Sequence, residues 1–166
     1  MIFKSKSPRS QEGLERIRRG VEGLRARKLN VWLPAYLLLQ AEIGCDVGQF
    51  DEALKLLDEA EELIELQAHP VCEAELYRLR ARAELSRGSS AEVVEDCFDL
   101  SFAVARRQNA KFWELRTAVS RAGYWRDRGK YAEARELLAP VYGWFTEGFD
   151  TRDLKEARAL LDELSS

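Results

Sequence analysis

The stretch AEIGCDVGQFDEALKLLDEA, residues 41–60, contains small, glycine and apolar positions that recur in AGYWRDRGKYAEARELLAPV, residues 122–141. The two stretches agree at relative positions 0, 7, 9, 12, 16 and 19, which hold alanine, glycine, an aromatic residue, alanine, leucine and a small apolar residue. Midway between them, Ala81 and Gly88 repeat the first two positions. The chain therefore contains an internal repeat with a period of about 40 residues.

The residue types at these positions predict pairs of closely packed helices. Small side chains at Ala41, Ala81 and Ala122 let two helix backbones approach each other. Glycine seven positions later suits the end of the first helix, because a left-handed residue there lets the next amides bond the last carbonyls. The combination resembles the tetratricopeptide repeat, a helix pair whose usual period is 34 residues. We expect an all-α, tetratricopeptide-like superhelix of about three helix pairs, with one N-terminal helix and one C-terminal capping helix.

Apolar residues at helical spacing predict where the individual helices lie. Ser10 is a candidate N-cap for the first helix, which we expect to end near Lys28. The last helix should begin after Asp150 or Thr151, and its polar outer face would close the end of the stack. Residues 1–10 are expected to form a disordered tail, and residues 11–166 a single domain. The helices expected between these ends span residues 31–46, 50–67, 70–87, 91–108, 110–128 and 131–145.

Composition excludes several classes of protein. The net charge of −3 lacks the basic excess typical of a nucleic-acid binder. The longest apolar run, residues 31–39, is far too short to span a bilayer, so no membrane association is expected. Cys45, Cys72 and Cys97 are odd in number and contain no CxxC pair, which favours free thiols in a reducing compartment. We therefore expect a cytoplasmic protein.

Motifs for catalysis or metal binding are absent from the sequence. His69 is the single histidine, and it precedes Pro70 at an expected helix junction, where a structural role outweighs a catalytic one. Paired acids such as Glu61 and Glu62 belong to an acidic helical run, which favours a solvated face over an acid/base pair. The sequence therefore predicts no enzymatic activity, no cofactor and no metal.

Much of the chain resembles one family of large bacterial signalling proteins. The segments EAELYRLRAR (residues 73–82) and AVARRQNAK (residues 103–111), together with residues 114–164, are similar to its C-terminal tetratricopeptide region. The run APVYGWFTEGFDT, residues 139–151, is the most distinctive part. In that family, an adenylate/guanylate cyclase or a winged-helix DNA-binding domain precedes a STAND-type AAA ATPase and then the repeats. The resemblance implies a sensory or scaffold module that controls an output domain, without the phosphate-binding loop of the ATPase.

The first helix of each pair lines the concave groove in tetratricopeptide stacks, which points to the candidate site. Four arginines on the first helices of the second and third pairs could hold a carboxylate, a phosphate or an acidic peptide through bidentate hydrogen bonds. The alternative is that Arg78, Arg82 and Arg116 pair with glutamates on neighbouring turns of their own helices. Those glutamates would be Glu75, Glu84 or Glu114. The candidate partner-binding residues are Glu42, Glu75, Arg78, Arg82, Arg116 and Arg126.

The aromatic cluster of Tyr142, Trp144, Phe145 and Phe149 has two interpretations. It either forms a docking patch for another domain or fills the corner between the last pair and the capping helix, and core packing is the more common role. The function expected is a non-enzymatic interaction or scaffold module that binds a protein or peptide, including an acidic one, in its groove. The alternative function is a small-ligand sensor that regulates a cyclase or ATPase output domain. A second copy of the chain is a further candidate partner, which would give a homo-oligomer.

Overall fold

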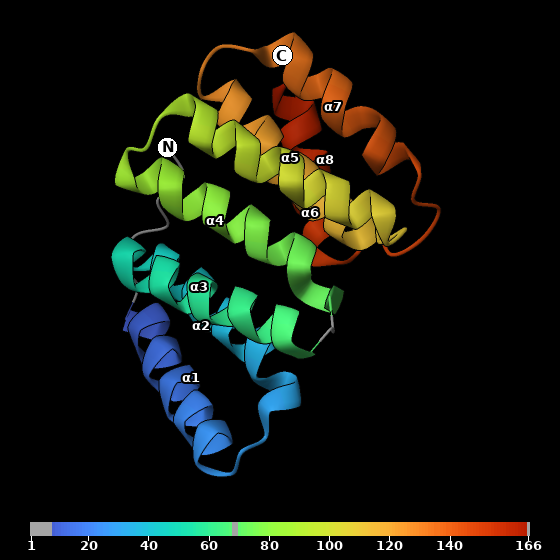
Figure 1. Cartoon of the computed structure of the whole chain (residues 1–166). Helices are drawn as coiled ribbons and strands as arrows, with labels where there is room; N and C mark the ends of the chain where they lie inside the picture. The colour runs from blue at the N-terminus through green and yellow to red at the C-terminus, as the bar shows by residue number, and fades with distance from the viewer. Residues whose placement is uncertain (1–7, 68–69, 166) are drawn as a thin grey trace.

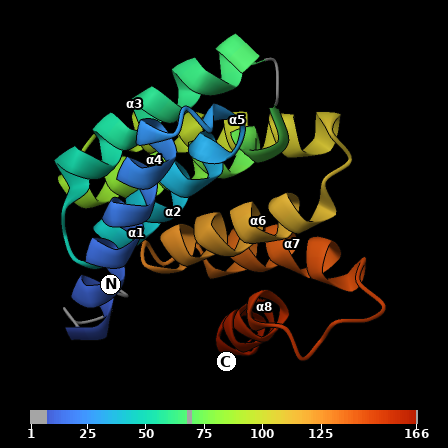
Figure 2. The same cartoon turned by 90° about the horizontal axis from the view of Figure 1, so that it is seen from below.

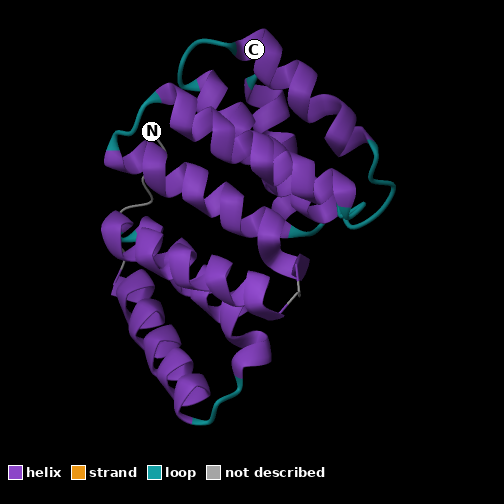
Figure 3. Cartoon of the chain, viewed as in Figure 1, coloured by secondary structure: helices purple, strands orange, loops and turns teal. Residues whose placement is uncertain are grey.

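The chain is all-helical (Figures 1 and 3). The computed structural model describes residues 8–67 and 70–165, and His69 lies outside them. Within this part of the chain there are eight α-helices and two short 3-10 helices, η1 (Asn30–Trp32) and η2 (Pro70–Cys72). The α-helices are α1 (Pro8–Ala26), α2 (Leu33–Asp46), α3 (Phe50–Gln67), α4 (Glu73–Arg87), α5 (Ala91–Arg107), α6 (Lys111–Arg126), α7 (Tyr131–Gly143) and α8 (Arg152–Glu163).

Three predicted helix starts differ from the observed ones. The first helix begins at Pro8, so residues 8–10 belong to α1 and Ser10 is not its N-cap. The expected helices from residues 31 and 70 each begin with a 3-10 turn, and their α-helical parts start at Leu33 and Glu73. Thr151 precedes α8, but its hydroxyl donates to the Gly148 carbonyl and does not cap the helix.

The glycines of the repeat end the first helices as predicted. Gly48, Gly88 and Gly129 have φ angles of +82°, +88° and +76°. In each case the amide after the glycine bonds the carbonyl five residues earlier, at 2.8–3.0 Å. This is the Schellman arrangement, in which a left-handed residue satisfies carbonyls at the end of a helix. Lys28 and Asn109 adopt the same conformation after α1 and α5, with φ angles of 56° and 52°.

The helices form antiparallel pairs that stack in sequence order. The pairs are α2 with α3, α4 with α5 and α6 with α7, and each second helix also contacts the helix that follows it. Among the first helices, α4 contacts both α2 and α6, and α8 contacts both α6 and α7 (Figure 2). Helix α8 therefore occupies the position that the first helix of a further pair would take, and α1, which packs on α2, lies at the opposite end.

Small and aliphatic side chains fill the interfaces between these helices. Ala41, Ala81 and Ala122 are fully buried, as the repeat predicts. The core extends from α1 to α8, with the largest clusters in α1–α4 and α5–α8. The three cysteines are free, and Cys45 and Cys97 are buried in this core. Among the described residues, no helix is both long and apolar enough to cross a membrane.

The aromatic cluster near residue 145 divides between the two expected roles. Tyr142 and Phe145 pack against the core of α5–α8, where they fill the corner as expected for core residues. Trp144 and Phe149 are about half exposed. Each exposed ring contacts one of the partly buried rings, with centroids 5.2 Å apart for Trp144 and Phe145. The cluster is thus anchored in the core and reaches the surface.

Candidate partner-binding face

The first helices α2, α4 and α6, together with α8, each contribute one side to a common surface, which we call the first-helix face. Contacts between α2 and α4, between α4 and α6, and between α6 and α8 bring these four helices side by side. Polar and charged side chains from all four meet across this surface. Segments that are far apart in the sequence therefore contribute to one set of interactions.

A buried ion pair on α4 lies at the centre of the first-helix face. Arg78 donates from Nε to Glu75 Oε2 at 2.7 Å and from Nη2 to Glu75 Oε1 at 2.6 Å. Their side chains are only 6% and 8% exposed. The two residues are three positions apart in a helix, which places them on the same side of α4. Two parallel charge-assisted hydrogen bonds hold the guanidinium plane in a fixed orientation.

Further contacts extend this pair onto the neighbouring helices. Arg78 reaches Glu42 Oε1 on α2 at 3.1 Å and Ser120 Oγ on α6 at 3.1 Å. Arg116 on α6 donates to Glu42 at 2.9 Å and to Glu75 at 2.8 Å. Its other terminal nitrogen reaches Asp153 on α8 at 3.1 Å. We call this set the central ionic network, and it consists of Glu42, Glu75, Arg78, Arg116 and Asp153.

Two smaller ionic groups lie on the same face. Arg82 on α4 pairs with Asp46 on α2, and both side chains are about one-third exposed. Arg126 on α6 pairs with Asp127 at 2.8 Å and with Glu163 on α8 at 2.6 Å. Every arginine predicted for the site is therefore already bonded to a carboxylate of the same chain.

The charges of the central network stabilise one another. Burial acts to raise the pKa of Glu42, but the guanidiniums nearby, of which Arg78 has the strongest effect, outweigh burial and lower this pKa. Burial acts to lower the pKa of Arg78, and Glu75 and Glu42 together raise it. Both groups are consequently charged near neutral pH. Across the three groups, four arginines meet six carboxylates, so these ion pairs together carry more negative than positive charge.

The structure brings together four of the six predicted site residues. Glu42, Glu75, Arg78 and Arg116 belong to the central ionic network, whereas Arg82 and Arg126 lie in the two smaller groups. Of the alternative pairings within one helix, only the pair of Arg78 with Glu75 is present. The partners of Arg82 and Arg116 lie on other helices.

Sequence reasoning missed Asp153, Glu163 and Ser120. Four ion pairs between neighbouring helices of this face join residues 36 or 37 positions apart, as in Arg82 with Asp46 and Arg126 with Glu163, whereas Arg116 and Glu75 are 41 positions apart. The separation of 36 or 37 positions is one helical turn less than the repeat period of about 40 residues. A search for carboxylates at that distance from each arginine would have found Asp153 and Glu163. Nothing in the local sequence marks Ser120.

Comparison of this chain with family models, with curated proteins and with solved structures finds no match. The interpretation of the site therefore rests on its geometry. In the described part of the chain, no three His, Cys, Asp or Glu side chains are placed to hold a metal ion together. What the first-helix face offers is a continuous surface of fixed charges, partly open to solvent, on four adjacent helices.

Proposed function

We propose that the chain is a tetratricopeptide-like superhelix that binds a peptide segment of a partner protein on its first-helix face, without catalysing a reaction. The observation that supports this proposal is the row of oriented polar side chains across α2, α4, α6 and α8. Repeat proteins expose such extended surfaces because each helix pair adds a similar strip to the same side.

The charge of the face favours a basic or neutral segment over the acidic peptide that the arginines first suggested. Each predicted arginine already binds a carboxylate, so an acidic ligand would have to displace it. Exposed carboxylate edges remain on Asp46, with 31% of its side chain exposed, and on Glu163, with 59%. Lysine or arginine side chains of a partner could bond these oxygens without breaking the central network.

The resemblance to signalling proteins suggests a role for this binding. As part of a regulatory protein, a segment held on the first-helix face would couple the repeats to an output domain. The resemblance of residues 73–164 to the repeat region of those proteins supports this role.

The proposal can be tested by selecting peptides against the immobilised protein and measuring their affinity by fluorescence anisotropy. Neutralising the face with Asp46→Asn and Glu163→Gln should weaken a selected basic peptide about tenfold, which is the loss expected from about 1.4 kcal/mol of binding free energy. The matched control is Glu133→Gln with Glu136→Gln, which removes the same charge from exposed positions of α7. Equal weakening by both double variants, or by neither, would contradict binding on this face.

A further inference from the structure

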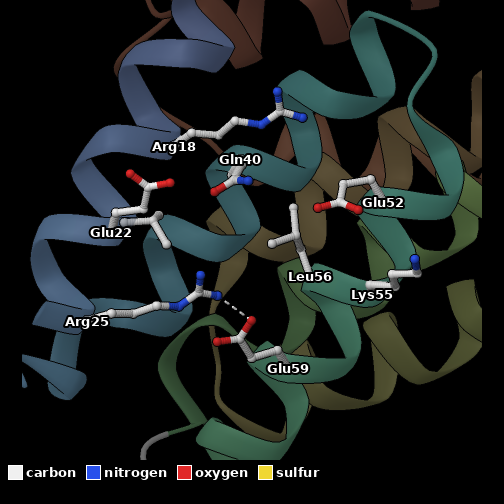
Figure 4. A pocket seen from close by; sticks show the side chains of 9 residues that line it. Arg18, Glu22, Arg25, Gln40, Glu52, Lys55, Leu56 and Glu59 are labelled. Atoms are coloured by element: carbon white, nitrogen blue, oxygen red, sulfur yellow. Dashed lines mark hydrogen bonds and ion pairs between the residues drawn. The ribbon is translucent and has the colours of Figure 1, made fainter.

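A polar pocket lies at the other end of the molecule from α8, between α1, α2 and α3 (Figure 4). It is open to solvent and has a volume of about 260 Å³. Buried Val21 and Leu56 form its apolar part, and Gln40 of α2 lies between the other two helices. Charged residues of α1 and α3 surround it, and these are Arg18, Glu22, Arg25, Glu52, Lys55 and Glu59.

Gln40 is a polar residue without a partner inside this pocket. The residue is 5% exposed, and its Oε1 atom is shielded and has no hydrogen bond among the described residues. An unsatisfied buried amide costs about 1–3 kcal/mol, so such groups normally have a partner. Half a turn about the last side-chain bond would present either the oxygen or the nitrogen of the amide to a molecule in the pocket.

Most charged groups around the pocket also have bonding capacity left. Arg25 is paired with Glu59 at 2.5 Å, which closes one end of the pocket. Within the described residues, Glu22, Glu52 and Lys55 make no ion pair. Arg18 makes one hydrogen bond, from Nη2 to Gln49 at 2.7 Å, which leaves further N–H donors of its guanidinium free. Charged groups of both signs with bonding capacity left therefore line the pocket, with Arg18 and Glu22 on α1 and Glu52 and Lys55 on α3.

We propose that this pocket binds a small zwitterion of the size of a free amino acid. A ligand with one ammonium and one carboxylate group matches both signs, since Glu22 and Glu52 can accept from the ammonium, and Lys55 and Arg18 can donate to the carboxylate. Gln40 would bond a polar atom of the ligand at the base of the pocket. The volume lies below the roughly 300–1,000 Å³ of pockets for drug-sized ligands, which fits a molecule of this size. The site is separate from the first-helix face, and binding here would join α1 to α3.

Isothermal titration of the full chain with each standard L-amino acid tests the proposal, with butylamine and butyrate as ligands that carry a single charge. At least one amino acid should saturate the protein, and neither single-charge compound should do so at the same concentrations. Lys55→Gln should raise the dissociation constant about tenfold. The matched change Lys130→Gln, at the start of α7, should leave it unchanged.

A second variant distinguishes loss of the site from loss of the fold. Gln40→Leu should abolish the heat of binding without lowering the melting temperature of the free protein, because it replaces an unsatisfied amide with an apolar side chain in a buried position. The proposal is overturned if no amino acid saturates the protein, which would indicate a pocket filled by water alone. It is also overturned if butylamine or butyrate binds as well as the best amino acid, or if Lys55→Gln and Lys130→Gln have the same effect.

Discussion

At Arg78 the guanidinium is removed from water and surrounded by Glu75, Glu42 and Ser120. Replacing one member of a buried ion pair leaves an uncompensated charge, which costs about 3–5 kcal/mol. We therefore expect Arg78→Met to lower the free energy of unfolding by about that amount in urea denaturation followed by circular dichroism. Arg158→Met, at an exposed position of α8, should leave the midpoint unchanged. An intact midpoint for Arg78→Met would show that the pair contributes little.

Glu42 makes the stability dependent on pH in the acid range. Its pKa in the folded chain is lowered below the ordinary value of 4.5. The stabilisation that follows is fully present above pH 4.5 and is lost as the pH falls through the lowered pKa. Thermal unfolding between pH 7 and pH 3 should show a fall in melting temperature for the intact chain.

The variant Glu42→Gln provides the comparison for this titration. It should melt at a lower temperature than the intact chain near pH 7, because Arg78 loses a charged partner. The difference between the two proteins should become smaller as the pH falls below 4.5. A difference that stays constant across this range would assign the acid sensitivity to other carboxylates.

The sequence predicted four of the five residues of the central ionic network and missed Asp153. Glu75 and Arg116 were predicted because they occupy equivalent positions of successive pairs, 41 residues apart, and they do bond each other. Their shared partner Glu42 was predicted from the same face of α2. Asp153 was missed because irregular residues 144–151 interrupt the repeat before α8. Which side chains of two neighbouring helices form ion pairs depends on how far one helix is shifted along the other, and the repeat period alone does not give this shift.

At the scale of the helix, the left-handed residues that end each element allow a direct test. Gly88→Ala should destabilise the chain by about 1 kcal/mol, because an L-residue adopts φ near +88° at a cost. Asn109→Gly should stabilise the chain, because Asn109 has the same left-handed conformation at the end of α5 and glycine adopts it at a lower cost. Urea denaturation of both variants measures the two shifts. Shifts of the same sign would contradict this account of the helix ends.

Helix boundaries were predictable where glycine marks them and less so elsewhere. The ends of α2 and α4 follow from Gly48 and Gly88, because few other residues tolerate this conformation. The starts of the same helices were misplaced, since η1 and η2 precede them and the N-cap residues Trp32 and Cys72 make no side-chain cap hydrogen bond. A helix end that one glycine determines was thus easier to predict than a helix start that depends on the packing of a 3-10 turn.

For the whole molecule, stacking in one direction predicts a gradient of stability. Helices α4 and α5 are covered by neighbours on both sides, whereas α1 and α8 each have neighbours on one side only. In such stacks the terminal elements open more readily than the central ones. Hydrogen exchange followed by mass spectrometry should show the slowest exchange in α4 and α5 and the fastest in α1 and α8. Uniform protection along the chain would indicate unfolding as one cooperative unit.

The bond from Arg116 to Glu42 joins residues 74 positions apart and passes over an entire helix pair. An ordinary solenoid can gain or lose a repeat by gene duplication or deletion, because each unit meets only the next one. Here an inserted or deleted pair would remove the bond between Arg116 and Glu42 and leave each of these sheltered charges with fewer partners. This bond therefore opposes a change in the number of pairs between α2 and α6, and descendants of the chain should diversify by substitution more readily than by changing the number of their repeats.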